Sequence, residues 1–443
     1  MAYLKCIFSE CGLEYPVSSV AFRCEHGHPT DVVYDKTPST SLKETFYKRR
    51  DHHGNIFDES GVWRFRELLN FCQIDTFDTI ECANHFVSLD GSEGRLSKPY
   101  HMKRAAQFAG AEGESLWLQP EGYNPSGSFK DNGMATAVTH GKMVGAKRLI
   151  CASTGNTSAS AGMFAANEGM ECDVYIPAGQ IAPGKLSQAY QFGAQIIEVD
   201  GNFDDALEQS LQDVDNDGYT VNSINPFRIE GQKTIPYRLL EHLEWKAPDW
   251  IVYPGGALGN TSSCGKALLE LYKWGWIKKM PRIAVINAQG ASTLYNLYNG
   301  KFGPKLRWND GDVDTALIDD YYDKMGSRGL DPHTHASAIQ IGKPANILKC
   351  LRALDATNGV VVTVSDKEML DAMAVVGLNG FDCEMASGAS LAGIKKLMES
   401  EVIKKDDVVV GILTGRQKDS MLPVQYHNDP SNRFARPPRN RDR

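Results

Sequence analysis

The stretch WIVYPGGALGNTSSCGKALLELYKW, residues 250–274, joins an apolar run, a glycine-rich turn and a helical segment. The run at 250–254 is rich in β-branched and aromatic residues, which predicts a buried strand. A second apolar run, RIAVINA at 282–288, follows the helical segment. Continuous apolar strands that alternate with helices indicate a parallel sheet covered on both faces. The stretch therefore predicts an α/β fold.

The same alternation extends along the chain on both sides of this stretch. Similar apolar runs, each followed by a loop and then in most cases by a helical segment, are RLICAS (148–153), CDVYIP (172–177), QIIEVD (195–200), VVVTVSD (360–366) and DVVVGILTG (407–415). Such repeated strand–helix units are typical of α/β proteins. The pattern predicts an α/β architecture over most of the chain.

The composition excludes several classes of protein. The 443 residues are 42% hydrophobic and 23% charged, with a net charge of −8, so neither nucleic acid nor an anionic membrane is an expected partner. We find no apolar run of about 18 residues and no signal-peptide core at the N-terminus. The ten cysteines are scattered, as is typical of reduced thiols. We expect a cytoplasmic protein.

Cysteine and histidine residues are concentrated in the first 30 residues. They are Cys6, Cys11, Cys24, His26 and His28. Their order permits a zinc site, but the first spacing is longer than the paired spacings of most tight structural sites. A degenerate metal ribbon and ordinary buried cysteines are the alternatives, and we predict no metal ligand here.

The glycine-rich turn YPGGALGNTSS, residues 253–263, is a candidate phosphate site. Backbone N–H groups at a glycine turn that enters a helix attract an anion. The turn does not match the dinucleotide pattern, since Pro254 stands at the first glycine position. It does not match the nucleoside-triphosphate loop either, because Cys264 stands at the second glycine position. We expect a single small phosphate, with an ordinary tight turn as the alternative.

Two further polar clusters follow predicted strands. ASTGNTSAS (152–160) offers hydroxyls, an amide and the N–H groups of a helix start, which suit a carboxylate or phosphate. NSINPFRIEGQKT (222–234) offers Asn222, Ser223 and a guanidinium, Arg228, which binds oxyanions with two hydrogen bonds. A simple helix cap and a loop with a solvated arginine are the respective alternatives.

Lys130, in NPSGSFKDNGM (124–134), stands at the start of a predicted helix. The helix dipole disfavours a cation there, which lowers the pKa of the amine. A lysine with a lowered pKa, a phosphate site and a carboxylate site are the requirements of pyridoxal phosphate chemistry. The alternative is a solvated loop lysine.

Together these motifs resemble the threonine synthases, fold-type-II pyridoxal phosphate enzymes related to the tryptophan synthase β-subunit. The matching motifs are NPSGSFKDNGM, ASTGNTSAS, GNFDDAL, NSINPFRIEGQKT, PGGALGN, ASAIQIGKP and LTG, spread over roughly residues 60–420. The resemblance implies two open sheets of parallel type covered by helices, with an irregular N-terminal extension. The expected parts are an extension at 1–85, a large cofactor-binding domain at 86–130 and 226–430, a small domain at 131–225 and a flexible tail at 431–443.

The resemblance also implies a role for each polar residue. Lys130 would attach the cofactor and move protons at the substrate carbons, with Phe129 packed beside the cofactor ring. Asn156 and Thr414 would contact the phenolic oxygen and the pyridine nitrogen. The residues that would cradle the cofactor phosphate are Gly255, Gly256, Ala257, Leu258, Gly259 and Asn260. Those that would bind the substrate are Ser153, Thr154 and Thr157 at its carboxylate and Asn222, Ser223 and Arg228 at its phosphate.

The implied reaction is that of a carbon–oxygen lyase acting on phosphates in threonine biosynthesis. O-phospho-L-homoserine and water would give L-threonine and phosphate by γ-elimination and β-addition of water. The family usually forms homodimers. Two alternatives remain: a relative acting on another phosphorylated amino acid, such as a cysteate synthase that joins O-phosphoserine and sulfite, and a non-catalytic protein of the same fold.

The chain departs from the family pattern near the expected substrate pocket. The segment at 87–100 lacks a Thr-Pro pair, QPEG at 119–122 replaces KDEG, Asn132 replaces an arginine, and Arg416 replaces a histidine. Since cations are gained or lost at these positions, they are expected to influence which anion the site accepts.

Overall fold

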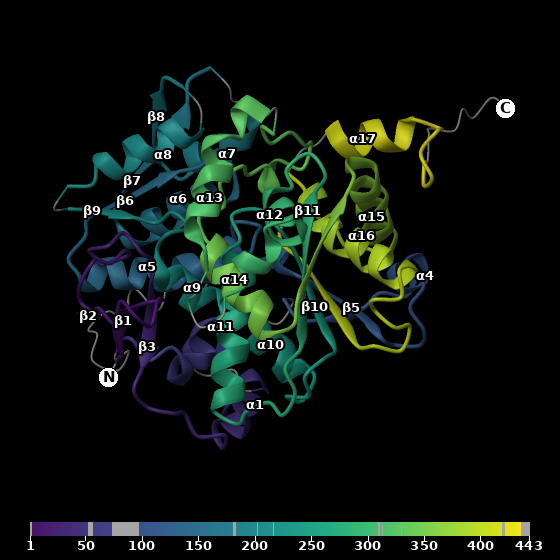
Figure 1. The fold of residues 1–443 in the computed structure, drawn as a ribbon, viewed down its shortest axis with the longest axis horizontal. Helices are drawn as coiled ribbons and strands as arrows, with labels where there is room; N and C mark the ends of the chain where they lie inside the picture. The colour runs from purple at the N-terminus through teal and green to yellow at the C-terminus, as the bar shows by residue number, and fades with distance from the viewer. Residues whose placement is uncertain are drawn as a thin grey trace.

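Three sheets organise the chain in the computed structural model (Figure 1). The described residues are 2–51, 56–72, 97–179, 183–201, 203–215, 217–308, 311, 313–328, 330–418 and 421–435. The departure expected within residues 87–96, the expected domain boundary at 85–86 and the last eight residues of the tail lie outside them.

The largest sheet has six strands in the order β12-β11-β10-β13-β5-β4. The strands are β4 (Tyr100–His101), β5 (Leu116–Pro120), β10 (Trp250–Pro254), β11 (Arg282–Ala288), β12 (Val360–Val364) and β13 (Val409–Leu413). All neighbouring pairs are parallel except β4 with β5 at the edge. The apolar run at 250–254 therefore forms an inner strand, as predicted.

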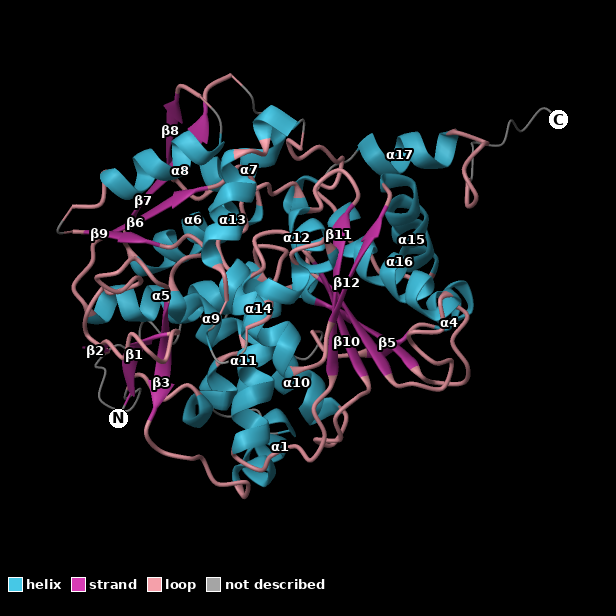
Figure 2. Cartoon of the chain, in the orientation of Figure 1, coloured by secondary structure: helices cyan, strands magenta, loops and turns pink. Residues whose placement is uncertain are grey.

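Alternate residues of the inner strands enter two different cores. On β10, Ile251 and Tyr253 belong to the core shared with α11 (Gly259–Lys273) and α14 (Ile347–Ala356). Trp250 and Val252 belong to the core shared with α15 (Asp366–Leu378) and α16 (Met385–Glu399). Figure 2 shows α15 and α16 on one side of this sheet, with α11 and α14 on the other. The period of two in a strand explains the division.

The second large sheet is wholly parallel and has the order β8-β7-β6-β9. Its strands are β6 (Arg148–Ala152), β7 (Glu171–Pro177), β8 (Gln195–Val199) and β9 (Gly218–Thr220). The helices packed on it or beside it are α5 (Lys130–Met143), α6 (Asn156–Glu168), α7 (Pro183–Gln191) and α8 (Phe203–Gln212). The α/β class is confirmed, whereas the domain boundaries stay a prediction.

The N-terminal extension contains an antiparallel sheet of order β2-β1-β3, so the expectation of irregular structure is wrong for these residues. The strands are β1 (Ala2–Cys6), β2 (Glu14–Pro16) and β3 (Thr30–Tyr34), and helix α1 (Leu42–Asp51) follows. Gly12 and Gly27 have φ of 61° and 78° in the turns beside the sheet. Strands of three to five residues are too short to display a period.

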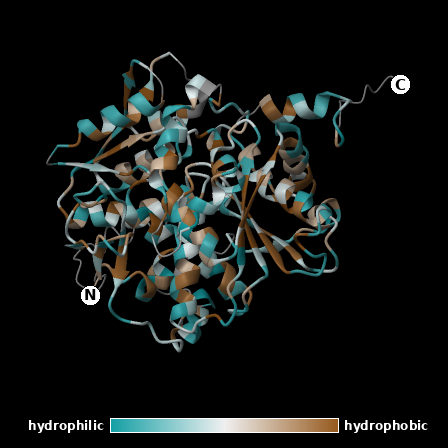
Figure 3. Ribbon diagram, in the orientation of Figure 1, coloured by the Kyte–Doolittle hydropathy of each residue, from teal (hydrophilic) through white to brown (hydrophobic). Residues whose placement is uncertain are grey.

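The other helices cover the sheets and connect them. They are α2 (Ile56–Glu59), α4 (Lys103–Ala109), α9 (Pro226–Gln232), α10 (Thr234–His242), α12 (Thr293–Asn299), α13 (Thr315–Asp323) and α17 (Met421–Asn428). Figure 3 shows hydrophobic colour concentrated on the inner strands and mixed colour on the outer helices, which is the pattern of amphipathic cover. Among the described residues, no helix has the length and apolar character needed to span a bilayer.

Three of the candidate motifs lie where parallel strands end. Thr414 follows β13, the glycine turn follows β10, and the 153–155 loop follows β6. An isolated bridge pairs Ser128 with Gly415 and so ties the turn before Lys130 to the end of β13. In parallel α/β sheets ligands bind at the carboxyl ends of strands, so this arrangement marks the site.

Candidate active site

Lys130 is the first residue of α5, as predicted. The backbone N–H of Phe129 donates to the carbonyl of Thr414 at 2.9 Å. The carboxylate of the next residue, Asp131, accepts hydrogen bonds from the Ser126 N–H at 2.7 Å and the Ser160 hydroxyl at 2.6 Å. These bonds fix the turn before the helix, and with it the origin of the lysine side chain.

The Lys130 amine lies 4.5 Å from the centroid of the Phe129 ring. Burial lowers the pKa of Lys130 to about 7, the positive charge of Arg228 adds to the effect, and Glu384 opposes it. The pKa is thus lowered, as predicted from the sequence, and burial is the first cause. A lysine with this pKa is substantially neutral at pH 7 and can act as a base or a nucleophile.

Arg228 has a buried guanidinium in which some N–H groups lack a hydrogen-bond partner among the described residues. Its side chain, on α9, is 1% exposed, and Nη1 donates to the carbonyl of Val221 at 2.9 Å. Neither Nε nor Nη2 has a partner among the described residues. Unpaired buried donors are costly, so two of them on one guanidinium indicate an anion site.

The glycine turn between β10 and α11 also contains buried polar atoms without a hydrogen-bond partner among the described residues. Both amide atoms of Asn260 and the Thr261 hydroxyl are buried and lack partners among the described residues. Leu258 precedes the helix at φ 64°. A Cβ atom at Gly256 would lie 3.0 Å from the carbonyl oxygen of Ala338, so a side chain there would require this backbone to shift. Orphaned polar groups at the N-terminus of a 15-residue helix fit a bound phosphate.

The 153–157 segment is positioned by Asn222. The Asn222 amide accepts from the N–H of Ala152 and donates to its carbonyl, both at 2.9 Å. The Ser153 hydroxyl accepts from the N–H of Gly155, and Thr157 lies buried in the first turn of α6. Because both amide atoms of Asn222 are engaged, its visible function is to hold the loop. Its predicted substrate contact stays a prediction.

A glutamate that the sequence analysis missed connects two predicted cofactor contacts. Glu384 accepts from Asn156 Nδ2 at 2.9 Å and from Thr414 Oγ1 at 3.2 Å. Lys418 donates to Asn156 Oδ1 at 2.9 Å. Burial raises the pKa of Glu384, while its contacts with Asn156 and Lys418 act in the opposite direction. The local signal, one acidic residue before a helix of small residues, is too weak to identify a site.

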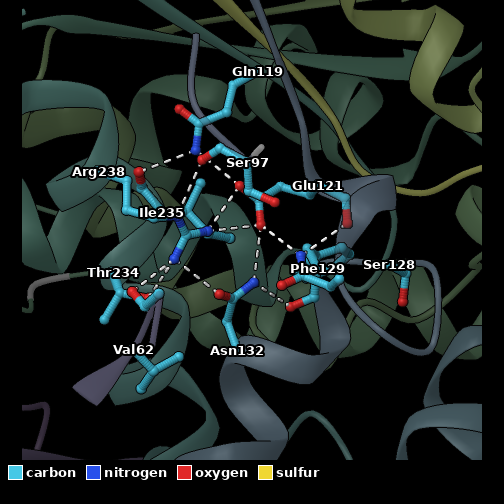
Figure 4. Close-up of polar contacts among 12 residues, drawn as sticks. Val62, Ser97, Gln119, Glu121, Ser128, Phe129, Asn132, Thr234, Ile235 and Arg238 are labelled. Carbon is cyan, nitrogen blue, oxygen red and sulfur yellow. Dashed lines mark hydrogen bonds and ion pairs between the residues drawn. The ribbon is translucent and has the colours of Figure 1, made fainter. Parts of the chain in front are cut away.

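Asn132 lies in a buried network with Glu121 and Arg238 (Figure 4). Its Nδ2 donates to Glu121 Oε2 at 2.9 Å, and its Oδ1 accepts from Arg238 Nη1 at 3.0 Å. Arg238 Nη2 also donates to both oxygens of Glu121, at 2.9 and 2.8 Å. A guanidinium from α10 therefore lies beside both Asn132 and Glu121.

Arg416 packs on the turn that precedes Lys130. Its N–H donates to the carbonyl of Gly127 at 2.9 Å. A Cβ atom at Gly127, which has φ of 88°, would lie 2.6 Å from Arg416 Nε. A Cβ atom at Gly122 would lie 2.7 Å from the Arg416 nitrogen. Arg416 therefore packs directly against this loop. The absence of a side chain at Gly122 and at Gly127 leaves the space for this close packing.

The structure brings Lys130, Arg228 and Glu384 into electrostatic contact and links Asn156 to Thr414 through Glu384. The backbone carbonyl of Ser223 accepts from Asn346 Nδ2 at 2.7 Å, and the Asn346 N–H donates to the carbonyl of Ala257 at 3.2 Å. Asn346 thereby joins the glycine turn to the Asn222–Arg228 segment. The Thr154 side chain has no hydrogen bond with the residues described above, so its predicted role stays a prediction from its position in the loop.

Comparison with known families identifies the chain's relatives. The family described as pyridoxal-phosphate dependent enzyme matches residues 98–415. A threonine synthase of Methanocaldococcus jannaschii is 33% identical over 96% of this chain and 95% of its own length. One from Methanosarcina acetivorans is 33% identical over 97% and 96%, and one from a Bacillus species is 41% identical over 68% and 78%.

Solved structures agree with the fold. A fungal L-serine ammonia-lyase from Rhizomucor miehei superimposes with a TM-score of 0.58 at 17% identity, covering 74% of this chain and 96% of its own. The processed threonine deaminase isoform 2 of Solanum lycopersicum gives 0.57 at 16%, covering 79% and 88%. At these identities the likeness concerns the fold, and the fold is that expected from the sequence.

Proposed function

The chain belongs to the threonine synthase family of pyridoxal-phosphate-dependent enzymes, and from this premise we propose that it converts O-phospho-L-homoserine and water to L-threonine and phosphate. The observation that carries the proposal is the pair of buried, unpartnered N–H groups on Arg228, whose charge acts on the Lys130 amine. A phosphorylated substrate with an acidic α-proton needs an oxyanion site close to a base.

The residues present fit the cofactor. Lys130 would hold it covalently, and the turn from Gly255 to Asn260 would hold its phosphate. Asn156 and Thr414, both hydrogen-bonded to Glu384, would face its ring oxygen and ring nitrogen. When bound, pyridoxal phosphate supplies an electron sink that stabilises negative charge at the substrate α-carbon.

The protein's own groups then perform the proton transfers. The Lys130 amine, with its pKa of about 7, accepts the proton from Cα and moves protons at Cβ and Cγ. Arg228 binds the substrate phosphate and stabilises the charge that develops as the Cγ–O bond breaks. Inorganic phosphate leaves Cγ, Cγ gains a proton, water adds its hydroxyl group at Cβ, and Cα regains its proton from Lys130. Ser153, Thr154 and Thr157 would orient the carboxylate, with Asn222 and Ser223 at the phosphate.

The test measures both products from defined substrates. Purified holoenzyme is supplied with O-phospho-L-homoserine, and free phosphate and L-threonine are quantified. We expect the two in equal amounts, and we expect no turnover with Lys130→Ala, which should also lack the visible absorbance of covalently bound cofactor. Phosphate release from O-phosphoserine, increased by sulfite and absent with O-phospho-L-homoserine, would instead identify the cysteate synthase alternative. Bound cofactor without turnover of either substrate would contradict both.

We also propose that the enzyme is a cytoplasmic homodimer. The support is the family resemblance together with the scattered free cysteines. Light scattering coupled to size-exclusion chromatography gives the mass of the particle, and fractionation of the source cells gives its compartment. A monomeric mass would contradict the first statement, and recovery outside the cytoplasm the second.

A further inference from the structure

The N-terminal sheet carries a cluster of soft ligands that the proposed reaction does not use. The sulfur atoms of Cys6, Cys11 and Cys24 and a ring nitrogen of His28 all lie within 4.8 Å of one another. Among the described residues, no other group of three or more histidines, cysteines and carboxylates meets this criterion. We propose that these four residues bind one structural Zn²⁺ ion.

The distances match those of a tetrahedral site. Cys11 Sγ lies 3.8 Å from Cys24 Sγ, and Cys6 Sγ lies 3.7 Å from His28 Nδ1. With Zn–S bonds of about 2.3 Å and Zn–N bonds of about 2.1 Å, tetrahedral geometry separates two sulfurs by about 3.8 Å and a sulfur from a nitrogen by about 3.6 Å. A disulfide would need sulfurs about 2.05 Å apart. The cluster therefore has the dimensions of a metal site, not of a disulfide.

The two loops that carry the ligands have suitable backbones. Cys6 is the last residue of β1 and Cys11 lies in the loop that follows it, and the Cys24–His28 pair lies in the loop before β3. The Cys24 N–H donates to the carbonyl of His28 at 2.8 Å, which closes the second loop. The Gly27 N–H donates to the carbonyl of Cys24 at 2.8 Å, a second hydrogen bond within the same loop.

The donor set selects zinc and a structural role. Three thiolates and one imidazole form a closed four-ligand site that leaves no position for a reacting water. Binding releases three thiol protons to solvent, and Zn²⁺ with three thiolates carries a net charge of −1. Because the thiols must lose these protons, zinc binds more weakly at low pH.

The sheet is small, so a metal ion would add to its stability. Its strands have three to five residues, and Leu4, Phe22 and Val32 are its buried apolar side chains between residues 2 and 34 other than cysteine. Units of this size usually need a metal or a disulfide for stability. The Phe8 ring, 4.6 Å from the His28 ring and 5.3 Å from Trp308, connects the metal loops to the body of the protein.

The sheet in turn contacts α14 and α9, of which α9 carries a residue of the candidate active site. Asp31 on β3 pairs with Lys349, at 2.8 Å, and with Arg352, both on α14. The Tyr34 hydroxyl donates to Glu230 on α9, the helix that carries Arg228. We therefore expect metal loss to loosen the N-terminal sheet without removing any group from the reacting centre.

The first experiment measures metal in the full-length holoenzyme. The protein is prepared without a metal-binding tag, dialysed against metal-free buffer, and assayed for zinc, iron, cobalt, nickel and copper by mass spectrometry. We expect about one zinc per chain, the occupancy of a single site. Zinc well below this value in protein grown with ample zinc, or iron in its place, would overturn the assignment.

Matched variants locate the metal. Cys11→Ser and His28→Asn should lose most of the zinc and show a lower Tm. His26→Asn is the control nearest to the cluster, since this exposed histidine has its Nδ1 3.3 Å from Cys11 Sγ but is outside the four-residue set. Cys172→Ser, on β7, controls for the loss of a cysteine. Full zinc content in Cys11→Ser would refute the ligand set. So would a loss of zinc in His26→Asn combined with full zinc content in His28→Asn.

A wild-type measurement keeps the test independent of folding defects in the variants. Titration with an organomercurial thiol reagent, followed with a colorimetric zinc indicator, should release zinc as the cluster thiols react. Cobalt-substituted protein should show the intense visible bands of a tetrahedral thiolate site. Absence of both signals would refute the proposal even if no variant folds.

Discussion

The positive charge of Arg228 acts on the amine of Lys130: burial is the first cause that lowers the pKa of this amine to about 7, and the charge of Arg228 is the second. The same guanidinium that would bind the substrate phosphate thus helps to keep the base neutral. When a phosphate dianion binds to Arg228, its negative charge offsets this effect. Substrate binding is therefore expected to raise the proton affinity of the base that acts on it.

Replacement of Arg228 should change the titration of Lys130. In Arg228→Met the like charge is absent, so the pKa of Lys130 rises and less neutral amine is present at pH 7. We expect the pH midpoint for covalent attachment of pyridoxal phosphate to apoenzyme to move upward and KM for the phosphorylated substrate to rise. Arg228→Lys, which keeps a charge, should shift the midpoint less. An unchanged midpoint in Arg228→Met would contradict the coupling.

Arg238 should be essential for stability because it pairs with a buried carboxylate. Both Arg238 and Glu121 are almost fully buried. In Arg238→Met the Glu121 carboxylate loses its cation, and removal of one partner of a buried pair costs about 3–5 kcal/mol. Urea unfolding measures this loss. The double variant Glu121→Gln/Arg238→Met should recover part of it, whereas Lys246→Met, which breaks an exposed pair with Glu244, should change the midpoint little.

Asn260 should contribute to binding of the cofactor phosphate. Its two amide atoms are buried without partners, so a ligand that pairs with them gains a charge-assisted hydrogen bond. We expect Asn260→Ala to weaken binding of pyridoxal phosphate to apoenzyme by about tenfold or more, the effect of losing about 1.5 kcal/mol or more. Fluorescence titration gives the Kd. Tyr272→Ala, at the exposed end of the same helix, is the control, and equal Kd values in all three proteins would exclude the contact.

His140 should make the stability of the protein depend on pH. Burial lowers the pKa of His140 to about 4, while its contact with the Val17 carbonyl opposes the shift. Since the unfolded chain binds this proton below about pH 6.5, stability is full at neutral pH and falls as the pH drops from about 6.5 to about 4, by about 3 kcal/mol in total. Denaturant midpoints across this range measure the slope.

A His140→Gln variant should flatten that slope because the titrating group is absent. It should also lower the stability at neutral pH, since the His140 ring stacks on Phe227 at 3.5 Å and its Nδ1 lies 2.7 Å from the Tyr219 hydroxyl. His335→Gln, at an exposed position, should leave the slope as it is. A slope that persists in His140→Gln would assign the pH dependence to another group.

The predictable part of the site consists of contiguous motifs. Lys130 and the glycine turn at 255–260 each lie within a single strand–turn–helix unit, so their chemistry and their local structure are encoded in the same dozen residues. The parallel inner strands were equally visible, because both faces of β10 are buried and its sequence is apolar throughout. Local propensity and function agree at these positions.

The unpredicted part depends on contacts between distant segments. Glu384 stands 228 residues after Asn156, and Arg238 stands 117 residues after Glu121. A single charged residue shows no periodicity or spacing from which its partner could be predicted. Its burial also depends on the fold and not on the neighbouring sequence. Asn132 shows the same limit, because its replacement of an arginine suggested an altered pocket whereas its amide completes a network with a guanidinium from another helix.

The strand order has a consequence for synthesis of the protein. β13, the last strand in sequence, lies between β10 and β5 in the middle of the six-stranded sheet. Until the ribosome has released residue 414, the edges of β10 and β5 that pair with β13 are unpaired. The hydrogen bond between the Phe129 N–H and the carbonyl of Thr414, beside Lys130, cannot form either. Unpaired edges promote aggregation, and late non-local pairing is slow. We therefore expect chains that terminate before β13 to be insoluble and catalytically silent, although Lys130, Arg228 and the glycine turn are all already present in them.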